Sequence, residues 1–127
     1  MTITEKFIQK DYSSNVLDKE LLPAIRAIQN ALKEKNPNEK QMASDLLKIL
    51  TITTQYDGPD IAEVVAEIFF ERQDLLKEAM ANVSEKDKNN TISALRFGWN
   101  LVKERLEQTS NSKSKIIAFN NLLEKLH

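Results

Sequence analysis

Apolar side chains recur at intervals of three and four residues along most of the chain, which is the spacing of one face of an α-helix. In residues 15–34 they fall in one stripe roughly 120° wide on a helical wheel, with charged residues opposite. Pro23 fits a helix only near its first turn, because it has no amide hydrogen to donate. We therefore predict a helix from Asn15 or Asp18 to about Glu34. Its apolar stripe consists of Leu17, Leu21, Ala24, Ile25, Ile28, Ala31 and Leu32.

Five further segments have helical periodicity, and several begin at a capping signal. Asn36 precedes Pro37, which suits the first helical position, and Ser84 has an acid three residues later at Asp87. The Asp-Gly-Pro-Asp sequence at 57–60 is the strongest turn signal in the chain. These further predicted helices cover residues 2–11, 37–54, 59–82 and 84–108, and a last one follows the polar linker at 110–114.

Two of these helices, residues 37–54 and 84–108, are predicted to lie inside the fold, because their apolar positions extend round more than one side. Gly98 lies within the second and costs about 1 kcal/mol relative to alanine, so we expect another backbone to approach it closely. Arg72 interrupts the apolar face of residues 59–82. Either the helix breaks or bends near Arg72, or its guanidinium reaches solvent or pairs with a carboxylate.

Composition supports an all-α fold. The chain has 127 residues, which fits one domain, and only two glycines and three prolines, too few for the many tight turns of an all-β domain. The prediction is a single compact bundle of five or six helices over residues 1–127, with orthogonal and up-down packing both open. The wide apolar coverage of residues 84–108 either closes a monomer or forms a homodimer.

Most catalytic chemistry is excluded by missing atoms. The chain has no cysteine, and its one histidine is the last residue, His127, so thiol nucleophiles and Cys/His zinc sites are absent. No glycine-rich phosphate loop is present. We predict no enzyme activity, no cofactor and no metal site. The start of the chain lacks the apolar core of a signal peptide, and no apolar run is long enough to cross a bilayer, so we expect a cytoplasmic protein without membrane contact.

Acidic residues form one row in the segment predicted as a helix over 59–82. Residues 57–78 contain seven acids and two bases, a local charge of −5. This row is either the solvated side of an amphipathic helix or a surface that binds a basic partner. Like charges four residues apart destabilise a helix, which keeps the partner hypothesis open, whereas a straight row diverges too far to chelate a metal. The row consists of Asp60, Glu63, Glu67, Glu71, Asp74 and Glu78.

The chain has one aromatic cluster, in the sequence Arg-Phe-Gly-Trp at 96–99. Trp99 belongs to a tight apolar stripe and is predicted to be core. Phe97 and Leu101 point to another side of the helix, so either further helices cover them or a partner does. The pattern favours the core for Phe97 as well.

Together these features favour a non-enzymatic protein-binding domain, such as an adaptor, inhibitor, immunity protein or regulatory subunit. Its predicted contact surfaces are the acidic row and the side of residues 84–108 that carries Phe97 and Leu101. The net charge of −1 argues against nucleic acid, but a helical nucleic-acid-binding or transcriptional regulator remains the alternative, through Lys19, Arg26 and Lys33. A third hypothesis is a ligand-binding bundle with a cavity that reaches Tyr56 or Arg72.

Overall fold

The computed structural model describes residues 21–35, 37–53, 59–108 and 113–126, and in these ranges it contains six helices and no strand. The all-α bundle predicted from the periodicity is therefore confirmed. None of the described helices is both long enough and apolar enough to cross a membrane. The predicted helix over residues 2–11 lies outside the described ranges. The helices are α2 (Leu22–Ala31), α3 (Glu39–Thr53), α4 (Pro59–Glu71), α5 (Gln73–Ala81), α6 (Glu85–Glu107) and α7 (Lys113–Lys125).

The segment predicted as one helix over residues 59–82 forms two helices, so the prediction of one continuous helix is wrong. The predicted alternative, a break near Arg72, is confirmed. Arg72 has backbone angles of φ −123° and ψ 65°, which are not helical, and it lies between the end of α4 and the start of α5. The amide of Leu75 then bonds to the carbonyl oxygen of Arg72 as α5 begins. The chain changes direction here, because the helical hydrogen-bond ladder cannot run through a residue in this conformation.

The start of α6 follows the predicted capping chemistry, whereas α3 begins at Glu39 and not at Pro37 as predicted. The hydroxyl of Ser84 accepts a hydrogen bond from the amide of Asp87 and donates one to its carboxylate at 3.0 Å, so Ser84 caps α6 and the Asp87 carboxylate holds the capping hydroxyl in place. Pro23 lies in the first turn of α2, where its missing amide hydrogen leaves no helical bond unmade.

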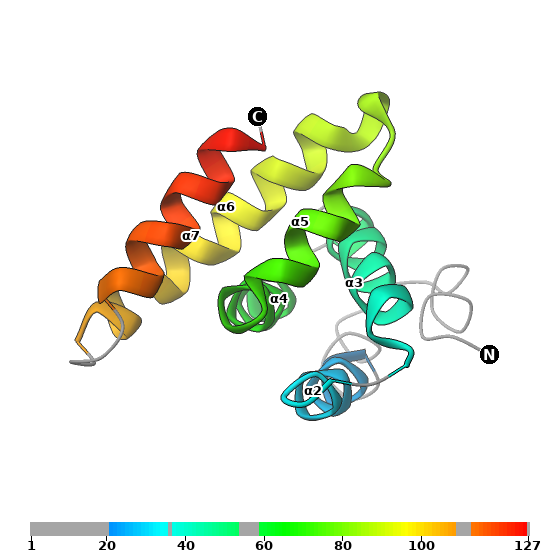
Figure 1. The fold of residues 1–127 in the computed structure, drawn as a ribbon, viewed down its shortest axis with the longest axis horizontal. Helices are drawn as coiled ribbons and strands as arrows, with labels where there is room; N and C mark the ends of the chain where they lie inside the picture. The colour runs from blue at the N-terminus through cyan, green and yellow to red at the C-terminus, as the bar shows by residue number, and fades with distance from the viewer. Residues whose placement is uncertain (1–20, 36, 54–58, 109–112, 127) are drawn as a thin grey trace.

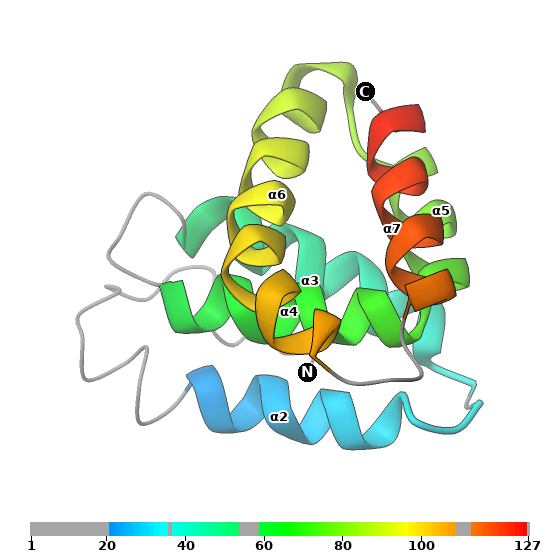
Figure 2. The ribbon, with the colours of Figure 1, turned by 90° about the vertical axis from the view of Figure 1, so that its left-hand side faces the viewer.

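The central helix of the bundle is α4, which contacts α2, α3, α5, α6 and α7. Between residues 61 and 70 only Glu63 and Glu67 are not buried. In Figure 1, α2 and α4 are seen nearly end-on while α6 and α7 run side by side across the view, and Figure 2 shows α6 rising steeply past α4. The packing is thus orthogonal. The prediction that residues 84–108 form an inner helix is wrong, since one side of α6 is exposed.

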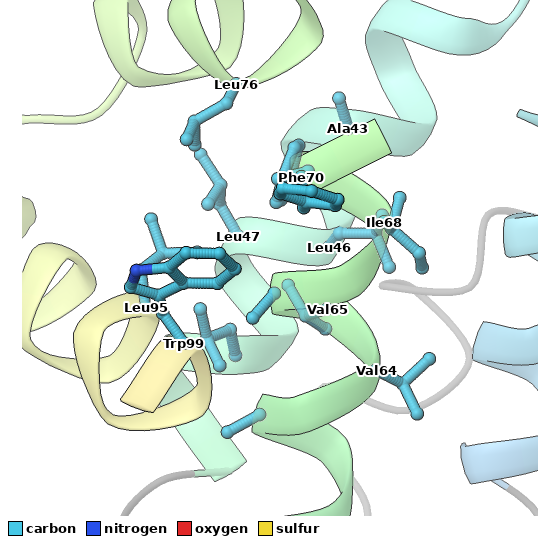
Figure 3. Close-up of a cluster of buried hydrophobic side chains, with 14 of the residues drawn as sticks. Ala43, Leu46, Leu47, Val64, Val65, Ile68, Phe70, Leu76, Leu95 and Trp99 are labelled. Atoms are coloured by element: carbon cyan, nitrogen blue, oxygen red, sulfur yellow. The ribbon is translucent and has the colours of Figure 1, made fainter. Parts of the chain in front are cut away.

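Three aromatic rings join α4, α6 and α7. Phe70 and Trp99 stack with ring centroids 5.5 Å apart, and Phe119 packs edge-on against Trp99 at 4.7 Å. The indole nitrogen of Trp99 donates a 2.7 Å hydrogen bond to Oδ1 of Asn120, so the ring's one polar atom is satisfied. Figure 3 shows Trp99 among the side chains of Leu95, Val65 and Leu47. The prediction that Trp99 is core is confirmed.

Gly98 of α6 lies directly against the backbone of Ala62 in α4. A β-carbon added to Gly98 would lie 2.6 Å from the carbonyl carbon of Ala62 and closer still to its oxygen. Real β-carbons do not make contacts this short, so only glycine permits this crossing. The close approach expected from a glycine inside a helix is confirmed.

Candidate functional site

The acidic row of the predicted helix is divided between two helices. Glu63, Glu67 and Glu71 lie on α4, and Asp74 and Glu78 lie on α5, beyond the break. The remaining member, Asp60, is in the first turn of α4, but its side chain lies outside what the structure describes. The row therefore does not form one straight helical face.

Four of these carboxylates form ion pairs with neighbouring basic groups. Glu71 pairs with Lys115 of α7 at 3.1 Å, and Glu78 pairs with Lys40 of α3 at 3.5 Å. These contacts use the acids to join α4 and α5 to other helices and reduce the negative field that a basic partner would feel. The other two pairs are Glu67 with Arg105 of α6 and Asp74 with Arg72.

Arg72 is the centre of the most connected polar cluster in the described part of the chain. Its Nη1 donates to the carbonyl oxygen of Leu32 at 2.9 Å, at the end of α2, and its Nη2 donates to Glu39 of α3 at 3.0 Å. Its Nε and Nη2 both donate to the carboxylate of Asp74, at 3.2 and 3.1 Å. The planar guanidinium thus ties the junction of α4 and α5 to α2 and α3.

This cluster shifts the pKa values of Arg72 and Asp74. The hydrogen bond to Asp74 is the main cause that raises the pKa of Arg72, with burial opposing it and Glu39 adding to it. The same bond lowers the pKa of the Asp74 carboxyl, against the effect of its partial burial. The sequence pattern identified Arg72 as anomalous on an apolar face. Leu32 and Glu39 were missed, because no local signal links residues about forty and thirty positions earlier to it.

The exposed apolar surface of α6 lies on its side away from α4. Phe97 is 50% exposed and Leu101 is 43% exposed, one helical turn apart. The prediction that Phe97 is core is wrong: the described helices pack on the Trp99 side of α6 and leave the Phe97 side open. Ile117 of α7 is the other large apolar side chain that is exposed in the described ranges, at 61%.

We define the outer face of α6 as the exposed side chains within roughly 60° of Phe97 on the helical wheel. Around the apolar pair this face carries neutral amide and hydroxyl groups, and it has one positive charge near the start of the helix and one negative charge near its end. Interfaces commonly have few charges at their centre and aromatic residues there. The face consists of Lys86, Asn90, Ser93, Phe97, Asn100, Leu101, Glu104 and Gln108.

The basic row predicted for nucleic acid is only partly within the described residues. Arg26 and Lys33 are both exposed on or just after α2, and neither forms an ion pair with another described residue. Lys19 lies outside the described ranges. Proteins that bind a phosphate backbone tightly usually contact about six or more phosphates. Two cations seven residues apart are a small positive surface by comparison.

Two cavities between the helices are lined by residues that the structure describes. The larger, about 520 Å³, lies between α3, the end of α5 and the start of α6. The smaller, about 440 Å³, is lined by Lys33, Glu71 and Arg72 among others, so a cavity does reach Arg72. Tyr56, the other residue of the ligand-binding hypothesis, lies outside the described ranges. The guanidinium of Arg72 already donates to Leu32, Glu39 and Asp74. In the smaller cavity it therefore stabilises the wall and is not free to bind a ligand.

Comparison of the chain with known protein families, with curated proteins and with solved structures finds no match to any of them. Among the described residues, no three acidic or histidine side chains converge as a metal site requires.

Proposed function

We propose that the chain is a non-enzymatic protein-binding domain whose partner contacts the outer face of α6. The observation that carries this proposal is the exposure of Phe97 and Leu101, two large apolar side chains on neighbouring turns of the longest helix. Burying such a pair against a partner gains about 25 cal/mol per Å² of apolar surface removed from water. An aromatic residue at the centre of a neutral polar face is typical of the residues that dominate binding energy.

The acidic residues are a weaker basis for partner binding than the outer face of α6. Glu67, Glu71, Asp74 and Glu78 already have partners within the chain, and a basic protein would have to compete with these ion pairs. Exposed ion pairs contribute about 1 kcal/mol or less, so replacing an internal ion pair by one with a partner costs little and stabilises the complex little. We assign these carboxylates mainly to joining helices.

The proposed partner segment is an amphipathic helix. A helix of 23 residues such as α6 is about 34 Å long and presents a straight row rather than a closed pocket, so a second helix packed along it buries both apolar side chains. Lys86 and Glu104 lie at opposite ends of the face. A complementary helix would place an acid against Lys86 and a base against Glu104, which also sets its direction.

The test compares proteins retained by three immobilised full-length variants in extract from the native cell. Wild type and Ile117→Ser, which removes an exposed apolar residue on α7, should retain the same partner. Phe97→Ser combined with Leu101→Ser should lose it while unfolding at the same temperature as wild type. If the double variant retains every protein that wild type retains, the proposal is wrong.

The same variants separate a foreign partner from a second copy of the chain. If wild type sediments as a dimer and the double variant as a monomer, the partner helix is α6 of another molecule, and the homodimer alternative is correct. A further variant, Glu63→Gln with Glu67→Gln and Glu71→Gln, tests the acidic residues. Loss of the partner in this triple variant but not in the α6 variant would transfer the binding site to α4.

A further inference from the structure

The larger cavity has walls of opposite charge. Lys48 of α3 lines one wall and Asp87 of α6 lines the other, and the two do not pair with each other. Neither forms an ion pair with another residue in the part of the chain that the structure describes. The Asp87 carboxylate is held in place by the hydroxyl of Ser84 at 3.0 Å. The volume of about 520 Å³ is within the range of small-molecule sites.

A pair of hydroxyl groups also lines the cavity. Oγ1 of Thr51 on α3 and Oγ1 of Thr91 on α6 are 2.9 Å apart, and Thr91 is 2% exposed. Each hydroxyl is also within donor distance of a carbonyl oxygen four residues earlier, Leu47 for Thr51 and Asp87 for Thr91. A hydroxyl oxygen has two acceptor positions and one proton, so the Thr91 hydroxyl can also accept a hydrogen bond from a ligand group in the cavity.

The floor of the cavity is apolar. Leu47, Ala79 and Val83 contribute side chains from α3, α5 and the turn after α5. Together the cavity offers a cation on one wall, a fixed anion beside a threonine hydroxyl on the other, and a hydrocarbon surface below. We propose that it binds a small zwitterion, a free α-amino acid with an apolar side chain. This site does not depend on the outer face of α6.

The chemistry assigns each ligand group to one wall. The ligand carboxylate contacts the ammonium of Lys48, and the ligand ammonium contacts the carboxylate of Asp87 and the Thr91 hydroxyl. The aliphatic side chain covers Leu47 and Val83. Because a charged hydrogen bond is worth about 1.5–3 kcal/mol, losing either end should weaken binding about tenfold or more.

The test titrates the full-length, ¹⁵N-labelled protein with L-leucine and follows amide chemical shifts by NMR. Shifts should concentrate at residues 44–51 and 79–91. N-acetyl-leucine lacks the ammonium and leucinamide lacks the carboxylate, so each should bind about tenfold more weakly than leucine. The absence of localised shifts at millimolar leucine would overturn the proposal, as would equal binding of all three compounds.

Variants then assign the two charges. Lys48→Gln should remove the preference for leucine over leucinamide, and Asp87→Asn, which keeps an acceptor for Ser84, should remove the preference over N-acetyl-leucine. Lys77→Gln on the exposed side of α5 is the matched control and should change neither. Ser44→Leu should fill the cavity and abolish binding without lowering the unfolding temperature. Preferences that survive both charge variants would contradict the assignment.

Discussion

Gly98 of α6 lies directly against the backbone carbonyl of Ala62 in α4, with no room for a β-carbon between the two helices. We therefore expect Gly98→Ala to destabilise the protein by about 1–3 kcal/mol, although alanine is the better helix former, because the helices must separate. Urea unfolding followed by circular dichroism measures this change.

The control for this substitution is Ala62→Gly. The atoms nearest the added β-carbon belong to the backbone of residue 62, so removing the Ala62 methyl group should not rescue Gly98→Ala. A double variant as stable as Ala62→Gly alone would show that the side chain, rather than the backbone, sets the helix separation.

Arg72→Met should destabilise the protein by about 2–4 kcal/mol. The substitution leaves the Leu32 carbonyl and the Glu39 carboxylate, both in partly buried surroundings, without their donor. Arg72→Lys should recover only part of this loss, because an ammonium cannot reproduce the planar fork. Arg105→Met is the control. It breaks a more exposed pair with Glu67 and should cost less than about 1 kcal/mol in the same denaturant measurement.

Asn120→Leu should destabilise the protein by about 1–2 kcal/mol, since it leaves the buried indole N–H of Trp99 without its 2.7 Å acceptor. Asn121→Leu, at the next and exposed position of α7, should have little effect. Trp99 is the sole tryptophan, so its emission reports unfolding in both variants. Equal destabilisation by the two substitutions would contradict a role for the hydrogen bond.

Acidification should weaken the contact between Asp74 and Arg72. The folded-state pKa of Asp74 lies below its unfolded value of about 3.9, so the stabilisation is present above that pH and is lost as the pH falls through the folded-state pKa. Asp74 is largely exposed, which limits the effect to about 1 kcal/mol. The difference in unfolding free energy between wild type and Asp74→Asn should be largest near neutral pH and shrink towards about pH 2. A difference that does not change with pH would contradict this assignment.

Local chemistry made the helices predictable from the sequence. The cap at Ser84 and the backbone contact at Gly98 depend on residue types whose constraints act over a few positions, and both are confirmed. The exposure of Phe97 was not predictable in this way. A helical wheel shows that an apolar side chain exists on a face, but whether another helix covers that face depends on how many elements reach it.

The contacts of Arg72 also depend on tertiary structure that the sequence pattern does not reveal. An arginine in an apolar face indicated an irregularity, but its partners come from α2 and from α3. The larger cavity could not be predicted from the sequence either. Its walls are far apart along the chain, and Lys48 and Asp87 are ordinary surface residues until the fold brings them together.

The central position of α4 has a consequence for synthesis of the chain on the ribosome. Every other described helix contacts α4, and its apolar residues face several directions, yet α6 is complete only 36 residues after α4 ends (Glu71 to Glu107). At translation rates of about 5–20 residues per second, α4 waits a few seconds for this covering helix. During that interval the apolar residues of α4 that α6 later covers remain exposed.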